Sequence, residues 1–204
     1  MNTKFVLLLL SSIPVVCLAQ EDAARKNELA FGLGGIPSLS RSDASSLDAG
    51  SGIALQVNYG RRFLGGRSAA LYGEINFLAS PTREVSSSIR TATHDFASLY
   101  LTPGIRLKLL PTSRISPYTV AGGGYADYEQ STTRIDGQAN TVPRQLARGV
   151  FDFGAGVDVR IWRFVALRGE ARDFFTGSPA YNIRAISGGQ HNVVATGGFV
   201  LRWH

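Results

Sequence analysis

The fold is decided by Thr196-Gly197-Gly198-Phe199-Val200-Leu201-Arg202-Trp203, the eight residues before His204. Every second residue back from Trp203 is apolar or small, and the alternate positions include polar side chains. The first set is Leu201, Phe199, Gly197, Ala195 and Val193, and the second contains Arg202, Thr196 and Asn192. A strand that is apolar on one face and polar on the other is typical of a barrel wall with lipid outside.

Seven earlier segments show the same alternation, so the sequence predicts eight strands. They are 28–36, 52–59, 70–79, 96–109, 118–129, 150–161 and 164–175. Each is close to the length of about 9–11 residues that crosses a bilayer as a tilted strand. In 52–59 we expect Ile53, Leu55 and Val57 to face lipid. In 118–129 we expect Tyr118, Val120, Ala126 and Tyr128 to do so, with Asp127 inside, and at Pro103 we expect a bulge.

The connections between these segments alternate in length. Short ones fall near 61–68, 110–114 and 162–163, and long polar ones cover 37–51, 81–95, 130–149 and 176–190. Short periplasmic turns and long extracellular loops are the outer-membrane pattern. The sequence therefore predicts an all-β, transmembrane, eight-stranded antiparallel up-and-down β-barrel with both ends in the periplasm.

Aromatic residues give a second indication of membrane position. Tyr59, Phe63, Trp162, Phe164 and Trp203 fall at the expected periplasmic rim, and Phe96, Tyr128, Phe151, Phe174 and Phe175 fall at the outer rim. Two aromatic belts are expected at the two membrane surfaces.

The N-terminus reads as a cleavable signal peptide over 1–19. Lys4 precedes a mostly apolar run, and cleavage between Ala19 and Gln20 is expected. The remaining domains are a short periplasmic segment, 20–27, and the barrel, 28–204. Cys17 is the single cysteine, so no disulfide is expected after cleavage. The net charge of +6 does not indicate nucleic-acid binding, because export separates the protein from nucleic acid and no reading motif is present.

The polar face of the strands predicts a charged interior. The candidate network is Glu74, Arg106, Asp152, Asp158, Arg160, Arg168, Glu170 and Arg172, and Lys108 and Asp127 share the inward face. An eight-stranded barrel is just wide enough for its side chains to fill, so we expect a plug of paired charges. A narrow pore is the alternative.

The chain resembles the small eight-stranded outer-membrane β-barrels of the OmpA/OmpX type. The resemblance is carried by the hairpin of 153–160 with 167–173 and by the closing strand, in which Thr196, Gly198, Leu201 and Trp203 look like the assembly signal of such barrels. His204 departs from that pattern, because the aromatic is normally last. The resemblance implies delivery by periplasmic chaperones, insertion by the barrel-assembly machinery, and outer-membrane lipid and lipopolysaccharide as neighbours. It implies no particular activity. We expect a monomer in the Gram-negative outer membrane without a cofactor or metal.

Two other classes of protein are built on a similar barrel. A lipid A deacylase on the same barrel would need a nucleophile and a base. His94 and His191 fall near the outer rim, and His94 lies near Asp95 and Ser98 in the sequence. Four residues along a strand span about 13 Å at roughly 3.3 Å per residue, too far for direct activation of Ser98, so we expect no enzyme. A soluble lipocalin-like barrel would place the apolar set inside instead. The long loops carry arginines suited to phosphate contact, namely Arg41, Arg83, Arg90, Arg134, Arg144 and Arg184.

Overall fold

The computed structural model describes residues 25–41, 47–177 and 189–204, and these form ten β-strands. The signal segment with Ala19 and Gln20, and Arg184, lie outside the described residues. The strands are β1 (Asn27–Ile36), β2 (Leu39–Arg41), β3 (Leu47–Ala49), β4 (Gly52–Gly65), β5 (Ala69–Ser86), β6 (Asp95–Leu109), β7 (Ile115–Gln130), β8 (Gln145–Arg160), β9 (Val165–Gly177) and β10 (Gly189–Trp203).

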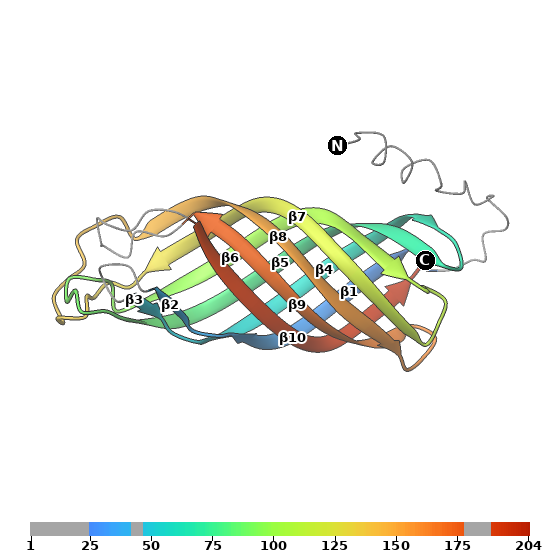
Figure 1. Cartoon of the computed structure of the whole chain (residues 1–204), viewed down its shortest axis with the longest axis horizontal. Helices are drawn as coiled ribbons and strands as arrows, with labels where there is room; N and C mark the ends of the chain where they lie inside the picture. The colour runs from blue at the N-terminus through green and yellow to red at the C-terminus, as the bar shows by residue number, and fades with distance from the viewer. Residues whose placement is uncertain (1–24, 42–46, 178–188) are drawn as a thin grey trace, which may run out of the picture.

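Eight of the ten strands close into an antiparallel ring in the order β5-β4-β1-β10-β9-β8-β7-β6, with β6 pairing back onto β5. All eight run obliquely to the long axis (Figure 1). Each ring strand pairs with the ring strand that follows it in the chain, and β1 pairs with β10 to close the ring. The predicted up-and-down ring is confirmed.

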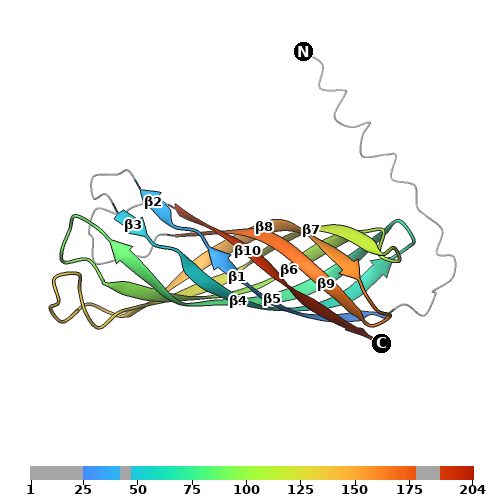
Figure 2. The ribbon, with the colours of Figure 1, turned by 90° about the horizontal axis from the view of Figure 1, so that it is seen from below.

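The two ends of the barrel differ. At one end, here the turn end, Asn27 pairs with Trp203, and the short connections 66–68, 110–114 and 161–164 join the strands. At the other, the loop end, the long connections emerge (Figure 2). There β2 pairs with β3, and β3 pairs with the extension of β5, so part of the predicted loop 37–51 is a small sheet. The ring strands are also longer than predicted, reaching 18 residues in β5.

The outer wall is apolar. Ile53, Leu55 and Val57 are 61%, 47% and 36% exposed, whereas Gln56 and Asn58, between and beside them, are buried in the lumen. Large apolar side chains are exposed in this way on all eight ring strands. A continuous band of this size is not tolerated against water in a soluble monomer. The lipocalin-like alternative, which needs these residues inside, is therefore wrong.

The facing expected for β7 is wrong. Tyr118, Val120, Ala126 and Tyr128 are buried in the lumen, and Asp127 is outside with Tyr125. The reason is that apolar side chains can also fill the lumen. The hydroxyl groups of the two buried tyrosines form hydrogen bonds there: Tyr118 donates to Glu170 at 2.6 Å, and the Tyr128 hydroxyl lies 2.8 Å from that of Thr176.

The two expected aromatic belts are matched unequally. At the turn end Tyr59, Phe63, Trp162, Phe164 and Trp203 are all exposed on the outside. At the loop end only Phe151 and Phe175 of the predicted set face outward. Phe96, Tyr128 and Phe174 are buried and belong to the interior, which corrects the prediction.

Pro103 does not produce the expected bulge. Its pairing with Ile75 keeps the register of the surrounding β5–β6 pairs, and the β6–β7 register is the same on both sides of it. Register shifts occur instead between Arg62 and Leu64 and between Ser80 and Arg83. Pro103 lacks only a ladder donor, and Gly122 and Gly124 on β7 bring the facing backbone close at this point.

Candidate functional site

The half of the lumen nearest the turn end is filled by charged side chains, and Glu28 on β1 is the anion that meets most of them. Its carboxylate lies 2.6 Å from Lys108, 3.1 Å from Arg106 and 3.2 Å from Arg202. Arg168 approaches it at 3.4 Å. Glu28 therefore joins four cations from three other strands.

Asp158 on β8 is the second anion of this layer. It lies 2.7 Å from Lys108, 2.8 Å from Arg168 and 3.0 Å from Arg202. Three of the cations that surround Glu28 thus also contact Asp158. The shared partners hold the two carboxylates in one compact cluster.

A second layer surrounds Arg172, one step toward the loop end. Its guanidinium lies 2.7 Å from Asp152 and 2.6 Å from Glu170, and it also pairs with Glu74. Arg106 connects the layers, because it lies 3.1 Å from Glu28 and 3.3 Å from Glu74. Rings of Tyr72 and Tyr118 lie 5.0 and 5.4 Å from the Arg106 guanidinium, in cation–π range.

The charges of this network balance. It contains five cations and five carboxylates, each with an ion-pair partner: Arg106, Lys108, Arg168, Arg172 and Arg202 against Glu28, Glu74, Asp152, Asp158 and Glu170. Buried charges are tolerated only when paired and hydrogen-bonded. The ten charged side chains, called the plug below, therefore carry no net charge in sum.

Neutral polar side chains cross-link the plug to the wall. The Gln56 amide donates to Glu170 at 2.7 Å and to Asn76 at 2.8 Å, and it accepts from Thr196 at 2.6 Å. Asn76 in turn donates to Thr102 at 3.2 Å. These bonds tie β4, β5, β6, β9 and β10 together across the lumen.

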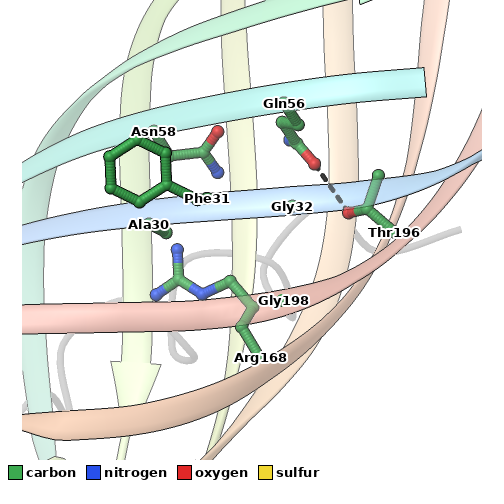
Figure 3. A pocket seen from close by; sticks show the side chains of 8 residues that line it. All are labelled: Ala30, Phe31, Gly32, Gln56, Asn58, Arg168, Thr196 and Gly198. Atoms are coloured by element: carbon green, nitrogen blue, oxygen red, sulfur yellow. Dashed lines mark hydrogen bonds between the residues drawn. The ribbon is translucent and has the colours of Figure 1, made fainter.

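A small cavity lies beside the plug. A cavity of about 10 Å³ lies between Gln56, Asn58, Arg168 and Thr196 (Figure 3). It has room for about one water molecule. In Figure 3 the Arg168 side chain lies on one side of the cavity, and the hydrogen-bonded side chains of Gln56 and Thr196 lie on the other. The cavity is therefore a gap between residues of the network.

The half of the lumen nearest the loop end contains a cluster of apolar and aromatic side chains. Tyr100 packs on Phe174 with ring centroids 4.9 Å apart, and on Tyr128 at 6.0 Å. Ile89 and Ile135, from two of the long connections, pack against this cluster. An aromatic layer therefore lies between the charged plug and the loops.

The structure brings together seven of the eight predicted network residues. Arg160 is the exception: it lies at the turn end, half-buried, and its guanidinium donates to the Thr112 carbonyl at 2.6 Å. Its position two residues beyond Asp158 takes it past the end of the plug. Asp127, as noted, is outside.

Sequence reasoning missed Glu28 as the central anion and Tyr118 as a lumen residue. The sequence did contain an indication for Glu28, because Glu28 alternates along the strand with Ala30 and Gly32, which lie on the inward face. Tyr118 gave none, because its strand alternates between apolar residues and small polar ones.

The side chains that a hydrolase would need do not come together in one site. His94 is exposed and lies 3.0 Å from Asp95, whereas Ser98 is buried in the lumen. His191 is exposed on the outer wall, with Nδ1 2.6 Å from Asp173. Within the residues that the structure describes, no group of three or more His, Cys, Asp or Glu side chains is arranged to hold a metal ion.

Arg83, predicted in a solvated loop, is instead 1% exposed. It extends β5 past the bulge and donates to the carbonyls of Gly50 and Ala49 and to Asn192. Its role is to fasten the β2–β3 sheet to the ring. Of the other loop arginines, Arg134 pairs with Asp136 at 2.8 Å and Arg144 with Glu129 at 2.6 Å.

The proposed assembly-signal residues divide between the two faces of β10. Thr196 points inward to Gln56, whereas Leu201 and Trp203 face outward. Gly198 meets the Phe31 carbonyl so closely that a side chain there would overlap the backbone of β1.

No helix within the described ranges is long and apolar enough to span a membrane.

Comparison with known proteins finds similarity in structure but not in sequence. No family model and no curated protein matches the chain. The structure is similar to that of Neisserial surface protein A, with a TM-score of 0.60 and 12% identity over 87% of this chain and 96% of that one. It is also similar to the outer membrane protein OprG from Pseudomonas aeruginosa, with a TM-score of 0.56 and 11% identity over 89% and 97% of the two chains. In its fold, this chain is a small eight-stranded β-barrel of the outer-membrane type.

Proposed function

We propose that this chain is an integral outer-membrane protein of a Gram-negative bacterium with a structural or surface-interaction role, and that it is neither a pore nor an enzyme. The observation that carries the proposal is the pairing of an apolar outer wall with a charge-balanced, side-chain-filled lumen in one closed ring. The wall supports residence in lipid. The filled lumen leaves the loops as the surface that meets other molecules.

The ends of the barrel support an orientation. Small outer-membrane barrels place short turns in the periplasm and long loops outside the cell. With that orientation the β2–β3 sheet and the connections 87–94 and 131–144 face the exterior. Arg90 is exposed there, and lipopolysaccharide phosphates are the anions that it would meet. The barrel itself needs no second copy to complete its ring, which favours a monomer.

Three measurements, one on fractionated cells and two on the purified protein, test this proposal. Heat-modifiable gel mobility after outer-membrane fractionation should show a folded barrel in the detergent-extracted outer membrane. Planar-bilayer recordings should show no discrete conductance, and lipid A incubated with the protein should keep its mass. Recovery in the soluble periplasmic fraction would contradict the location. Reproducible channels would contradict the plug, and a loss or gain of acyl chains would contradict the non-enzymatic role.

A further inference from the structure

The turn end of the barrel carries a belt of cations. Each of the three short turns has one arginine: Arg67, Arg114 and Arg163, all exposed. The adjoining strand ends add Arg25, Arg61 and Arg160. The described segments at this end, 25–27, 59–70, 107–116, 159–167 and 201–204, contain no Asp or Glu. Glu21 and Asp22, earlier in the sequence, lie outside the described residues.

Several of these cations are neighbours in space. The Arg25 guanidinium donates to the carbonyl of Arg163 at 2.5 Å. The backbone amide of Arg160 donates to Arg114 at 2.8 Å, which brings the two residues of this pair side by side. Like charges placed next to each other on neighbouring strands destabilise the protein unless a counter-ion lies between them. The folded barrel therefore favours an anion at this end.

The loop end is different. There, arginines lie beside carboxylates, as in the pairs of Arg134 with Asp136 and Arg144 with Glu129. Among the residues that the structure describes, cations without a neighbouring carboxylate thus gather at the turn end, whereas these loop-end arginines are paired.

Aromatic residues indicate what kind of anion fits. Arg163 stands between Trp162 and Phe164, both more than half exposed on the outside. Arg61 faces outward next to Tyr59 and pairs across the sheet with Asn27, whose other neighbour is Trp203. Tryptophan and tyrosine lie at the headgroup level of a bilayer. An anion that meets these arginines at that depth has acyl chains alongside the apolar wall.

We propose that this basic belt binds the headgroups of anionic phospholipids in the membrane leaflet at the turn end. The three turn arginines contact headgroup phosphates, and the flanking aromatic rings pack on the glycerol and upper acyl chains. This goes beyond the structural role proposed above, and it holds whether or not the lumen conducts.

Native mass spectrometry of the folded barrel in zwitterionic detergent tests it, with phosphatidylglycerol and phosphatidylcholine added in equal amounts. The parent should retain phosphatidylglycerol preferentially. The triple variant Arg67→Gln/Arg114→Gln/Arg163→Gln should bind it roughly a hundredfold more weakly, at about fivefold per basic residue. The matched control Arg90→Gln/Arg134→Gln/Arg144→Gln removes the same charge at the loop end and should bind like the parent. Gel mobility verifies that both variants are folded.

Four results would overturn the proposal. They are equal retention of the two lipids by the parent, an unchanged affinity of the turn-end variant, an equal loss in the loop-end control, and complete displacement of the lipid by excess inorganic phosphate. The last would mean that the belt is a site for free anions. A pull-down with isolated peptidoglycan sacculi forms a separate arm, and retention by sacculi without a preference for phosphatidylglycerol would assign the belt to that polymer instead.

Discussion

Replacing Glu28 by Gln tests whether the lumen is held by charge balance. The substitution keeps the shape of the side chain and removes one of the five carboxylates of the network, which leaves five cations against four anions. Arg106, Lys108, Arg168 and Arg202 each lose a contact of 2.6 to 3.4 Å. Each keeps one other anion, Glu74 for Arg106 and Asp158 for the remaining three.

The magnitude follows from this geometry. Breaking a buried ion pair costs about 3–5 kcal/mol of folding free energy, because an uncompensated charge stays buried. Since every cation keeps a partner, we expect the lower end, about 3 kcal/mol. Glu129→Gln is the matched control: its pair with Arg144 is 2.6 Å long but about half exposed, and exposed pairs contribute about 0–1 kcal/mol.

Urea unfolding of the barrel in detergent, followed by gel mobility and by the fluorescence of Trp162 and Trp203, measures both variants. The double variant Glu28→Gln/Lys108→Met restores four cations to four anions and should recover part of the loss. If Glu28→Gln is no less stable than Glu129→Gln, or if the double variant is less stable than Glu28→Gln by the full cost of a second buried charge, the charge-balance argument is wrong.

Three further outcomes are expected. Glu170→Ala should lower the unfolding free energy by about 3 kcal/mol by removing a partner of Arg172, without creating a conductance in planar bilayers. Leu55→Arg, on the outer wall, should cost about 2–4 kcal/mol in lipid vesicles, and a neutral result there would mean that this face does not meet hydrocarbon. The pKa of Asp136 is lowered by the backbone amide of Gln138 and by Arg134, so its contribution to the order of the 131–140 connection should be present above the carboxyl's unfolded pKa and be lost as pH falls through the folded value. Limited proteolysis of that connection across acid pH measures this, and cleavage that does not change with pH would contradict it.

The sequence predicted the ring well where one face of a strand is consistently large and apolar and the other polar. In β4 the alternation of Ile53, Gln56 and Val57 leaves no other facing, because a shift of one residue would put Gln56 into lipid. In β7 the same reasoning failed. Its inward face contains Tyr118 and Tyr128, whose rings fill the lumen and whose hydroxyl groups form hydrogen bonds there. Hydropathy alone cannot distinguish such an inward face from a face that contacts lipid.

The candidate site was predictable only in part, for a related reason. The alternation of residues along each strand predicted that Glu74, Asp152 and Glu170 lie on the inward face. It does not predict which charged side chains contact each other across the lumen. That depends on the stagger between strands, which sets the height of Glu28 against Lys108, 80 residues away in the chain. The position of Arg160 just beyond the plug depends on the same stagger.

Glu28 also has a consequence for how the molecule is completed. It lies on the first ring strand, and its partners Arg168 and Arg202 lie on the last two, across the seam where β1 meets β10. The pair with Arg202 cannot form until the last strand has joined the ring, and both pairs link parts of the chain that are far apart in sequence. The Glu28 carboxylate thus connects the first ring strand to the last two. Its ion pairs stabilise the closed barrel relative to an open sheet of the same strands.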